Sequence, residues 1–246
     1  MDIERLPIIS ELYGEKNSGS AEFCFYIAKS TNSLWIESCK RTCTKRAELM
    51  HIDLNSMHIC KVLNIYLLVN KLQTKEIHNF IETHKIKLLI INKLDDLTTA
   101  DHQEDTKSSL ELVKHLKMMY ITHSVKSIVI TNVRPGYSNS SLAKRLLGGM
   151  FANSAFSAYC AIEDEETESS KYNLNTYIAT QRFSKKDTPR STVHNNSWDS
   201  CMPTAFYIEK TPIPGVHMMR MVRPKTPNGL QYILKVNSDE ISVDRI

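Results

Sequence analysis

The sequence predicts an α/β protein whose central sheet is mainly parallel, with antiparallel strands toward the C-terminal end. Three observations support this fold class. Short apolar segments alternate with segments of helical periodicity over residues 6–132. The most apolar of them, residues 87–92, has the composition of a parallel strand that is covered on both faces. Two glycines, Gly14 and Gly19, follow the first apolar segment and precede a helical one.

Length and composition suit one folded domain, which we expect to span residues 1–246, with mobile loops near 133–153 and 184–202. The chain is 41% hydrophobic and 24% charged, as in ordinary soluble proteins, and its net charge of +4 permits an anionic partner. No segment has the length of a membrane span, and the acidic start is unlike a signal peptide, so we expect no membrane association. The six cysteines form no CxxC pair, so we expect no metal site.

The first half of the chain contains most of the predicted parallel strands and their helices. Strands are expected at residues 6–13, 33–38, 64–69, 87–92 and 127–132. Helices are expected at 23–28, near 47–50, at 74–84 and over 110–119. In the third of these, Ile77, Phe80 and Ile81 recur at helical spacing, and Thr74 is placed to cap the helix.

The second half changes character after residue 132. Residues 133–153 contain prolines, glycines and serines and predict a long loop, a feature that is usually functional or disordered. Four further strands are predicted, at 155–162, 174–180, 204–209 and 231–236, and acidic residues 163–168 suit an exposed hairpin tip. The methionines of the C-terminal region are expected in the core or in an interface: Met218, Met219 and Met221.

The segment from Gly14 to Ala21 organises the chain. Its glycine spacing fits the phosphate-binding loop, G-x-x-x-x-G-K-[ST], up to the second glycine, Gly19. Ser20 then stands where a lysine would reach the phosphates, and Ala21 stands where a hydroxyl would hold magnesium. Two glycines at this spacing also arise by chance, so the loop alone does not establish a nucleotide site.

Several segments, taken in order, resemble the core domain of RecA-type recombinases, and more closely the eukaryotic paralogues that assist recombination. The resemblance covers roughly residues 6–210 and rests on segments 10–15, 34–38, 87–92 and 128–132, followed by the pair Gly148-Gly149. It implies a RecA-like P-loop core with a mainly parallel sheet.

The departures from the family pattern fall on the residues that perform catalysis. Where the family has an acidic residue at the end of the strand matched by 88–91, this chain has Asn92, although Asp95 and Asp96 follow closely and could substitute. The family's catalytic glutamate corresponds to Cys39. Because phosphoryl transfer depends on positioned lysine and magnesium, we predict a pseudo-ATPase with no catalytic residue and no cofactor. Its degenerate nucleotide site would comprise Gly14, Gly19, Ser20, Ala21, Cys39 and Asn92.

The resemblance also places a loop for binding single-stranded DNA at residues 133–153. Arg134, Lys144 and Arg145 would contact phosphates there, and Tyr137 or Phe151 would stack on a base. A flexible connector whose charges are incidental remains the alternative interpretation of this segment.

The leading hypothesis is a nuclear, non-catalytic subunit of a complex that assists recombinase filament assembly in homologous recombination DNA repair. Its partners would be another recombinase paralogue, the main recombinase, or both. The family's N-terminal helical domain and polymerisation linker have no counterpart before the first strand, so we expect no self-propagating filament. One alternative is an active ATPase with a rearranged loop that uses Lys16. Another is an unrelated α/β protein with an accidental glycine turn.

Overall fold

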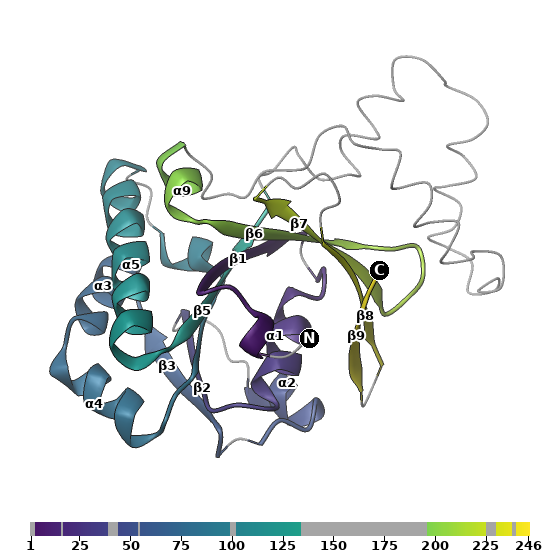
Figure 1. The fold of residues 1–246 in the computed structure, drawn as a ribbon, viewed down its shortest axis with the longest axis horizontal. Helices are drawn as coiled ribbons and strands as arrows, with labels where there is room; N and C mark the ends of the chain where they lie inside the picture. Colours follow the sequence, from purple (N-terminus) through teal and green to yellow (C-terminus); the bar gives the residue numbers. More distant parts are fainter. Residues whose placement is uncertain are drawn as a thin grey trace.

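A computed structural model describes residues 3–15, 17–38, 44–53, 55–98, 102–133, 196–224, 230–237 and 240–246. These residues form a nine-stranded sheet with helices on both faces (Figure 1). The predicted strands at 155–162 and 174–180, and the acidic segment 163–168, lie outside the described residues.

The sheet has the order β3-β2-β4-β5-β1-β6-β7-β8-β9, and its two parts differ in direction. The first six strands in this order pair in parallel: β3 (Met57–Val62), β2 (Ser33–Ser38), β4 (Leu88–Asn92), β5 (Lys126–Asn132), β1 (Ile9–Gly14) and β6 (Thr204–Lys210). The last three continue the sheet antiparallel: β7 (Val216–Arg223), β8 (Gln231–Val236) and β9 (Ile241–Arg245). The predicted fold class is therefore confirmed.

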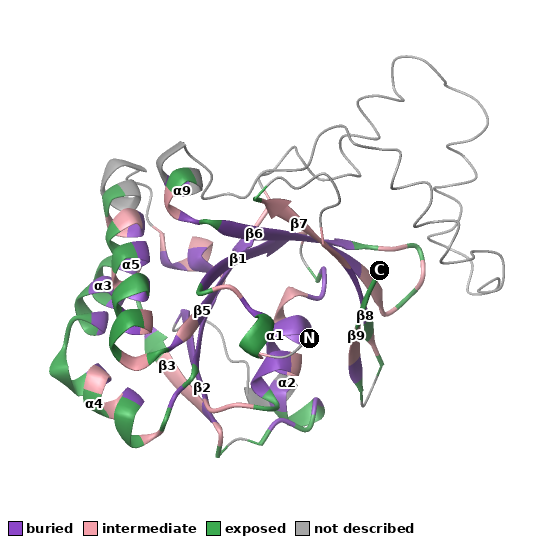
Figure 2. Cartoon of the chain, viewed as in Figure 1, coloured by how far each residue is buried: buried purple, intermediate pink, exposed green. Residues whose placement is uncertain are grey.

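Helices cover each face of the parallel strands. The described helices are η1 (Ile3–Arg5), α1 (Ser20–Ala28), α2 (Thr44–Leu49), α3 (Ile65–Leu72), α4 (Lys75–Thr83), η2 (Leu94–Leu97), α5 (His102–His123) and α9 (Asn196–Cys201). One apolar core lies under α1 and α2, and a second lies under α3, α5 and α9. Figure 2 shows the buried strands between these layers. Within the described residues, none of the helices has the length and apolar character needed to cross a membrane.

The strand predicted at residues 64–69 is wrong, because this segment begins helix α3. Asn64 caps the helix through its side-chain oxygen, which accepts a hydrogen bond from the Leu67 amide at 2.9 Å. The buried residues of α3 recur at helical spacing: Ile65, Leu68, Val69 and Leu72. The strand of this region is β3, which ends two residues before the cap.

Two other local predictions are confirmed. Thr74 caps α4, and its hydroxyl oxygen accepts a hydrogen bond from the Ile77 amide at 3.4 Å. In β7, Met218 and Met219 are fully buried and Met221 packs against the core that lies under α1. These methionines therefore belong to the core.

Candidate functional site

The candidate site begins with the loop that joins β1 to α1. Gly14 ends β1, and Gly19 precedes the first turn of α1 with a left-handed backbone at φ 91°. The Phe23 amide donates to the Gly19 carbonyl oxygen at 2.9 Å, so the helix starts at the second glycine. Because β1 lies between β5 and β6, the loop opens at the carboxyl edge of the parallel sheet, where α/β proteins bind their ligands. This is the strand–turn–helix context that the motif requires.

Close packing requires both glycines. A Cβ atom on Gly14 would overlap the hydroxyl of Ser18 and the carbonyl oxygen of Ile208 in β6. A Cβ atom on Gly19 would lie 2.9 Å from side-chain carbons of His217 and Leu234, in β7 and β8. The loop is therefore held between β6 and the antiparallel strands, and its glycine spacing has a structural cause in this chain.

The two residues that differ from the phosphate-binding motif, Ser20 and Ala21, are the first residues of helix α1. Ser20 and Ala21 are half-buried, and Ala21 packs against the core that α1 covers. Serine carries no charge at this position, and alanine offers no oxygen to a metal ion. Backbone amides at the start of α1 remain as the groups that favour an anion.

A row of polar side chains crosses β3, β2 and β4 near the same edge of the sheet. Glu37 in β2 is fully buried, and it is the register partner of Lys61 in β3 and of Asn92 in β4. Lys61 Nζ lies 3.0 Å from one carboxylate oxygen of Glu37. The other oxygen accepts hydrogen bonds from Trp35 Nε1 at 3.2 Å and from Asn92 Nδ2 at 3.4 Å.

These contacts neutralise the Glu37 carboxylate inside the protein. Lys61 supplies the positive charge, and Asn92 supplies a donor at the position where the family pattern has an acidic residue. An aspartate at position 92 would put a second carboxylate beside the first. Across the described part of the chain, no three histidine, cysteine, aspartate or glutamate side chains are arranged to hold a metal ion.

Asp95, the possible substitute for the missing acidic residue, has a structural contact of its own. One of its carboxylate oxygens accepts hydrogen bonds from the backbone amide and the side-chain amide of Asn132, at 2.8 and 2.7 Å. It thereby ties η2 to the end of β5. Burial raises the pKa of Asp95 to about 7, the Asn132 amide opposes this shift, and the charges of Asp96 and Glu11 add to it.

A second buried charge joins the antiparallel strands to the parallel sheet. Glu11 in β1 is fully buried, and Arg223 Nη2 in β7 lies 2.7 Å from one of its oxygens. The Thr131 hydroxyl in β5 donates to the other oxygen at 3.0 Å. Ala205, which lies between Glu11 and Arg223 in the register, is small enough to let the arginine reach across β6.

The structure brings together part of the predicted site. Gly14, Gly19, Ser20 and Ala21 form one loop, and Asn92 ends β4 beside Glu37. The other predicted positions lie outside the described residues: Lys16, Cys39, Arg134, Lys144 and Arg145. Sequence reasoning did not find the role of Lys61, because the ion pair depends on the register of β3, a strand that was not predicted.

Comparisons with known proteins support the fold. No protein-family model matches the chain, and no significant match to a curated protein is found. A KaiC-like protein from the hyperthermophilic archaeon Pyrococcus horikoshii matches with a TM-score of 0.54 at 11% identity, covering 96% of this chain and 88% of that one. The RadB recombinase matches with a TM-score of 0.55 at 12% identity, covering 95% and 89%. The chain therefore has the α/β fold of RecA-type proteins, with a mainly parallel sheet and antiparallel C-terminal strands.

Proposed function

We propose that this chain is a non-catalytic RecA-fold subunit of a nuclear complex that assists recombinase filament assembly in homologous recombination DNA repair. The observation that carries the non-catalytic part is the contact of the buried Glu37 carboxylate with exposed Lys61 and buried Asn92. At the edge of the sheet where this fold would hold magnesium, a lysine and an amide satisfy the carboxylate instead.

The loop supports the same proposal. Phosphoryl transfer depends almost wholly on positioning and on the charge that lysine and magnesium supply to the phosphates. Ser20 lacks that charge and Ala21 lacks a metal ligand, so the loop retains only backbone amides for an anion. The chain would therefore act by binding other proteins.

The recombination part of the proposal rests on two likenesses. The RadB recombinase shares the fold over 95% of this chain, and the segments that resemble recombinase paralogues fall in the family's order. The partner would be another recombinase paralogue or the recombinase itself. A RecA-type core has two different faces, and a subunit that uses one of them would cap or bridge a filament.

Filament assembly is the direct test of this role. The chain, purified together with its partner, would be added below stoichiometry to a recombinase and a labelled single-stranded oligonucleotide. We expect a shorter assembly lag, or slower disassembly, than with the partner alone. If the partner alone and the complex give the same time courses, the chain does not assist assembly.

A separate experiment tests whether the chain itself contacts DNA. Replacement of Arg134, Lys144 and Arg145 by alanine should weaken binding of the complex to every single-stranded sequence alike. Each lost phosphate contact should reduce the salt slope by roughly 0.7. Fluorescence anisotropy over a salt series measures both quantities. If affinity and slope are unchanged, any DNA binding by the complex belongs to the partner.

A further inference from the structure

Helix α5 carries apolar side chains on its outer side as well as on the side that faces the sheet. The helix has 22 residues and runs along one side of the molecule (Figure 1). Met118 is 48% exposed, Ile121 is 73% exposed, and Leu110 is half-buried. Single exposed apolar residues are common on protein surfaces, so the arrangement of these three decides whether they form a surface.

The three apolar residues lie on one face of α5. Met118 follows Leu110 by eight residues, and Ile121 follows Met118 by three, which is the spacing of neighbours on a helix surface. The stripe that they form extends over about three turns, or roughly 17 Å at about 1.5 Å per residue. Because two of its members are largely exposed, the described part of the chain leaves this apolar stripe uncovered.

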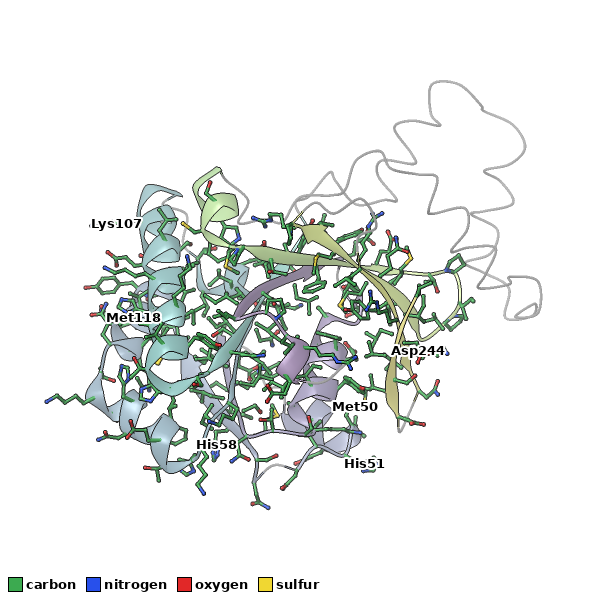
Figure 3. All side chains as sticks on the ribbon, viewed as in Figure 1. Met50, His51, His58, Lys107, Met118 and Asp244 are labelled. Atoms are coloured by element: carbon green, nitrogen blue, oxygen red, sulfur yellow. The ribbon has the colours of Figure 1, made fainter. Side chains whose placement is uncertain are left out.

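Lysines border the stripe. Lys107, Lys114 and Lys117 are exposed and follow one another by seven and three residues, so they lie on the same face. Figure 3 shows Lys107 and Met118 on the same side of the helix. Glu111 is the acidic residue among them, so the face has a net positive charge. The name α5 face is used below for these residues: Lys107, Leu110, Glu111, Lys114, Lys117, Met118 and Ile121.

A groove opens beside the α5 face. It has a volume of about 450 Å³ and lies between α5, the end of α3 and the start of α4. Its lining shares Glu111, Lys114 and Met118 with the α5 face and adds the apolar side chains of Leu72 and Met119. The face and the groove therefore form one continuous surface, with apolar side chains along its middle and lysines beside them.

Two contacts between side chains hold the walls of the groove in place. Gln73, the C-terminal cap of α3, donates a hydrogen bond from Nε2 to His115 Nε2 on α5 at 2.9 Å. His78 Nδ1 of α4 lies 2.7 Å from His123 Nε2 at the end of α5. These contacts fix the three helices relative to one another, so a ligand would find the groove already formed.

The charge of this surface comes from α5. Lys71 and Lys75, near the junction of α3 and α4, are balanced by Glu76 and Glu82 of α4. The three lysines of the α5 face exceed its one glutamate, so an acidic segment is attracted to the surface and a basic segment is repelled. A nucleic acid would pair with the lysines but would leave the apolar stripe without a partner.

We propose that the α5 face and its groove bind an acidic amphipathic helix of another protein. This helix would place apolar side chains on Leu110, Met118 and Ile121 and acidic side chains beside the lysines. Binding of a helix in a groove uses apolar anchors three, four and seven residues apart, which the length of the stripe accommodates. The proposal does not depend on the recombination role, because it rests on this surface alone.

Two designed peptides test the proposal with the full-length chain. Both have leucines at the helical spacing i, i+3 and i+7, and the other positions hold alanine with glutamate in one peptide and alanine with lysine in the other. Fluorescence anisotropy at low salt should show that the glutamate peptide binds about tenfold more tightly or better, and added salt should reduce the difference. If the chain binds neither peptide, or both alike, the proposal is wrong.

Variants of exposed residues locate the binding. Met118→Ser with Ile121→Ser should weaken binding of the glutamate peptide by about tenfold or more, because the apolar contact is lost. Leu63→Ser is the matched control, because Leu63 is 68% exposed and precedes α3, at the opposite end of that helix from the groove. This control should bind as the wild type does. Equal affinities of the wild type and the double variant would overturn the proposal.

Charge reversal separates recognition from a loss of structure. Lys114→Glu with Lys117→Glu should weaken binding of the glutamate peptide and strengthen binding of the lysine peptide, an inversion that misfolding cannot produce. If the preference does not invert, the lysines do not select the partner and the proposal is wrong. A labelled single-stranded oligonucleotide is the competing ligand. If it binds through these lysines while the glutamate peptide does not bind, the surface is a nucleic-acid site, which also contradicts the proposal.

Discussion

At the scale of single residues, Asn92 has a physical role at the end of β4. The side-chain amide of Asn92 donates to the buried carboxylate of Glu37, and Lys61 balances that carboxylate from the other side. Loss of Lys61 or Asn92 would leave the buried Glu37 carboxylate with fewer partners, which is costly. An acidic residue at position 92 would therefore disrupt these contacts.

Asn92→Asp should lower the free energy of unfolding by about 1–3 kcal/mol at neutral pH. The new carboxylate would face Glu37, and two like charges at this distance repel each other. Urea denaturation at neutral pH measures the loss. Asn79→Asp, on the exposed face of α4, is the control and should change stability by less than about 0.5 kcal/mol. Equal effects of the two substitutions would contradict the account of the cluster.

Asp95 gives stability a pH dependence of its own. Its pKa in the folded protein is about 7, above the ordinary value of 3.8. The stability it contributes is therefore present below about pH 4 and is lost as pH rises through 7. Asp95→Asn keeps an oxygen for Asn132 and removes the titration. Between pH 5 and pH 8 the wild type should lose stability relative to this variant, on the order of 2 kcal/mol. Asp244→Asn, at an exposed aspartate of β9, is the control, and the wild type should show no such pH-dependent loss of stability relative to it.

Sequence reasoning at this scale located residues but not their partners. Ser20, Ala21 and Asn92 could be identified because each occupies a fixed place in a local motif. The pairing of Lys61 with Glu37 could not be read in advance, because it depends on which residues of two strands stand opposite each other. The contact of Asp95 with Asn132 likewise joins residues that are 37 positions apart.

At the scale of elements, the β1–α1 loop is constrained by its packing as well as by its turn. Gly19→Ala should cost about 1–3 kcal/mol, because the residue has a positive φ and its new methyl group would meet His217 and Leu234. Thermal or urea denaturation measures the loss. Ser20→Ala, one residue further and already helical, is the control, with an expected change below about 0.5 kcal/mol. If Gly19→Ala leaves the stability unchanged, β7 and β8 do not hold the loop in the way described.

The accuracy of element prediction followed the strength of the local pattern. The fully buried strands β2 and β4 were predicted because they are continuously apolar at their centres. Strand β1 contains Ser10 and Glu11, and it was predicted from the apolar residues around them and from the glycine turn that follows. Residues 64–69 were wrongly predicted as a strand because their five consecutive apolar residues, 65–69, fit either periodicity, whereas Asn64 caps a helix. Strands β7 and β9 were missed because charged and histidine side chains interrupt their half-buried faces.

At the scale of the whole molecule, the pairing across the sheet joins segments from both ends of the chain. Glu11 and Arg223 are 212 positions apart, yet their ion pair fixes β7 beside β6 and β1. The fold class followed from the alternation of strands and helices, whereas this arrangement rests on long-range contacts that no local pattern contains. The antiparallel strands also pack against the β1–α1 loop, since His217 and Leu234 lie next to Gly19.

The central claim is that this RecA-type fold retains the frame of a nucleotide site without its chemistry. Release of inorganic phosphate from ATP by the purified chain, with and without magnesium and single-stranded DNA, tests it most directly. The account predicts a rate no higher than that of buffer under every condition. A steady, magnesium-dependent turnover that follows the protein through a further purification step and disappears in Lys16→Ala would contradict it.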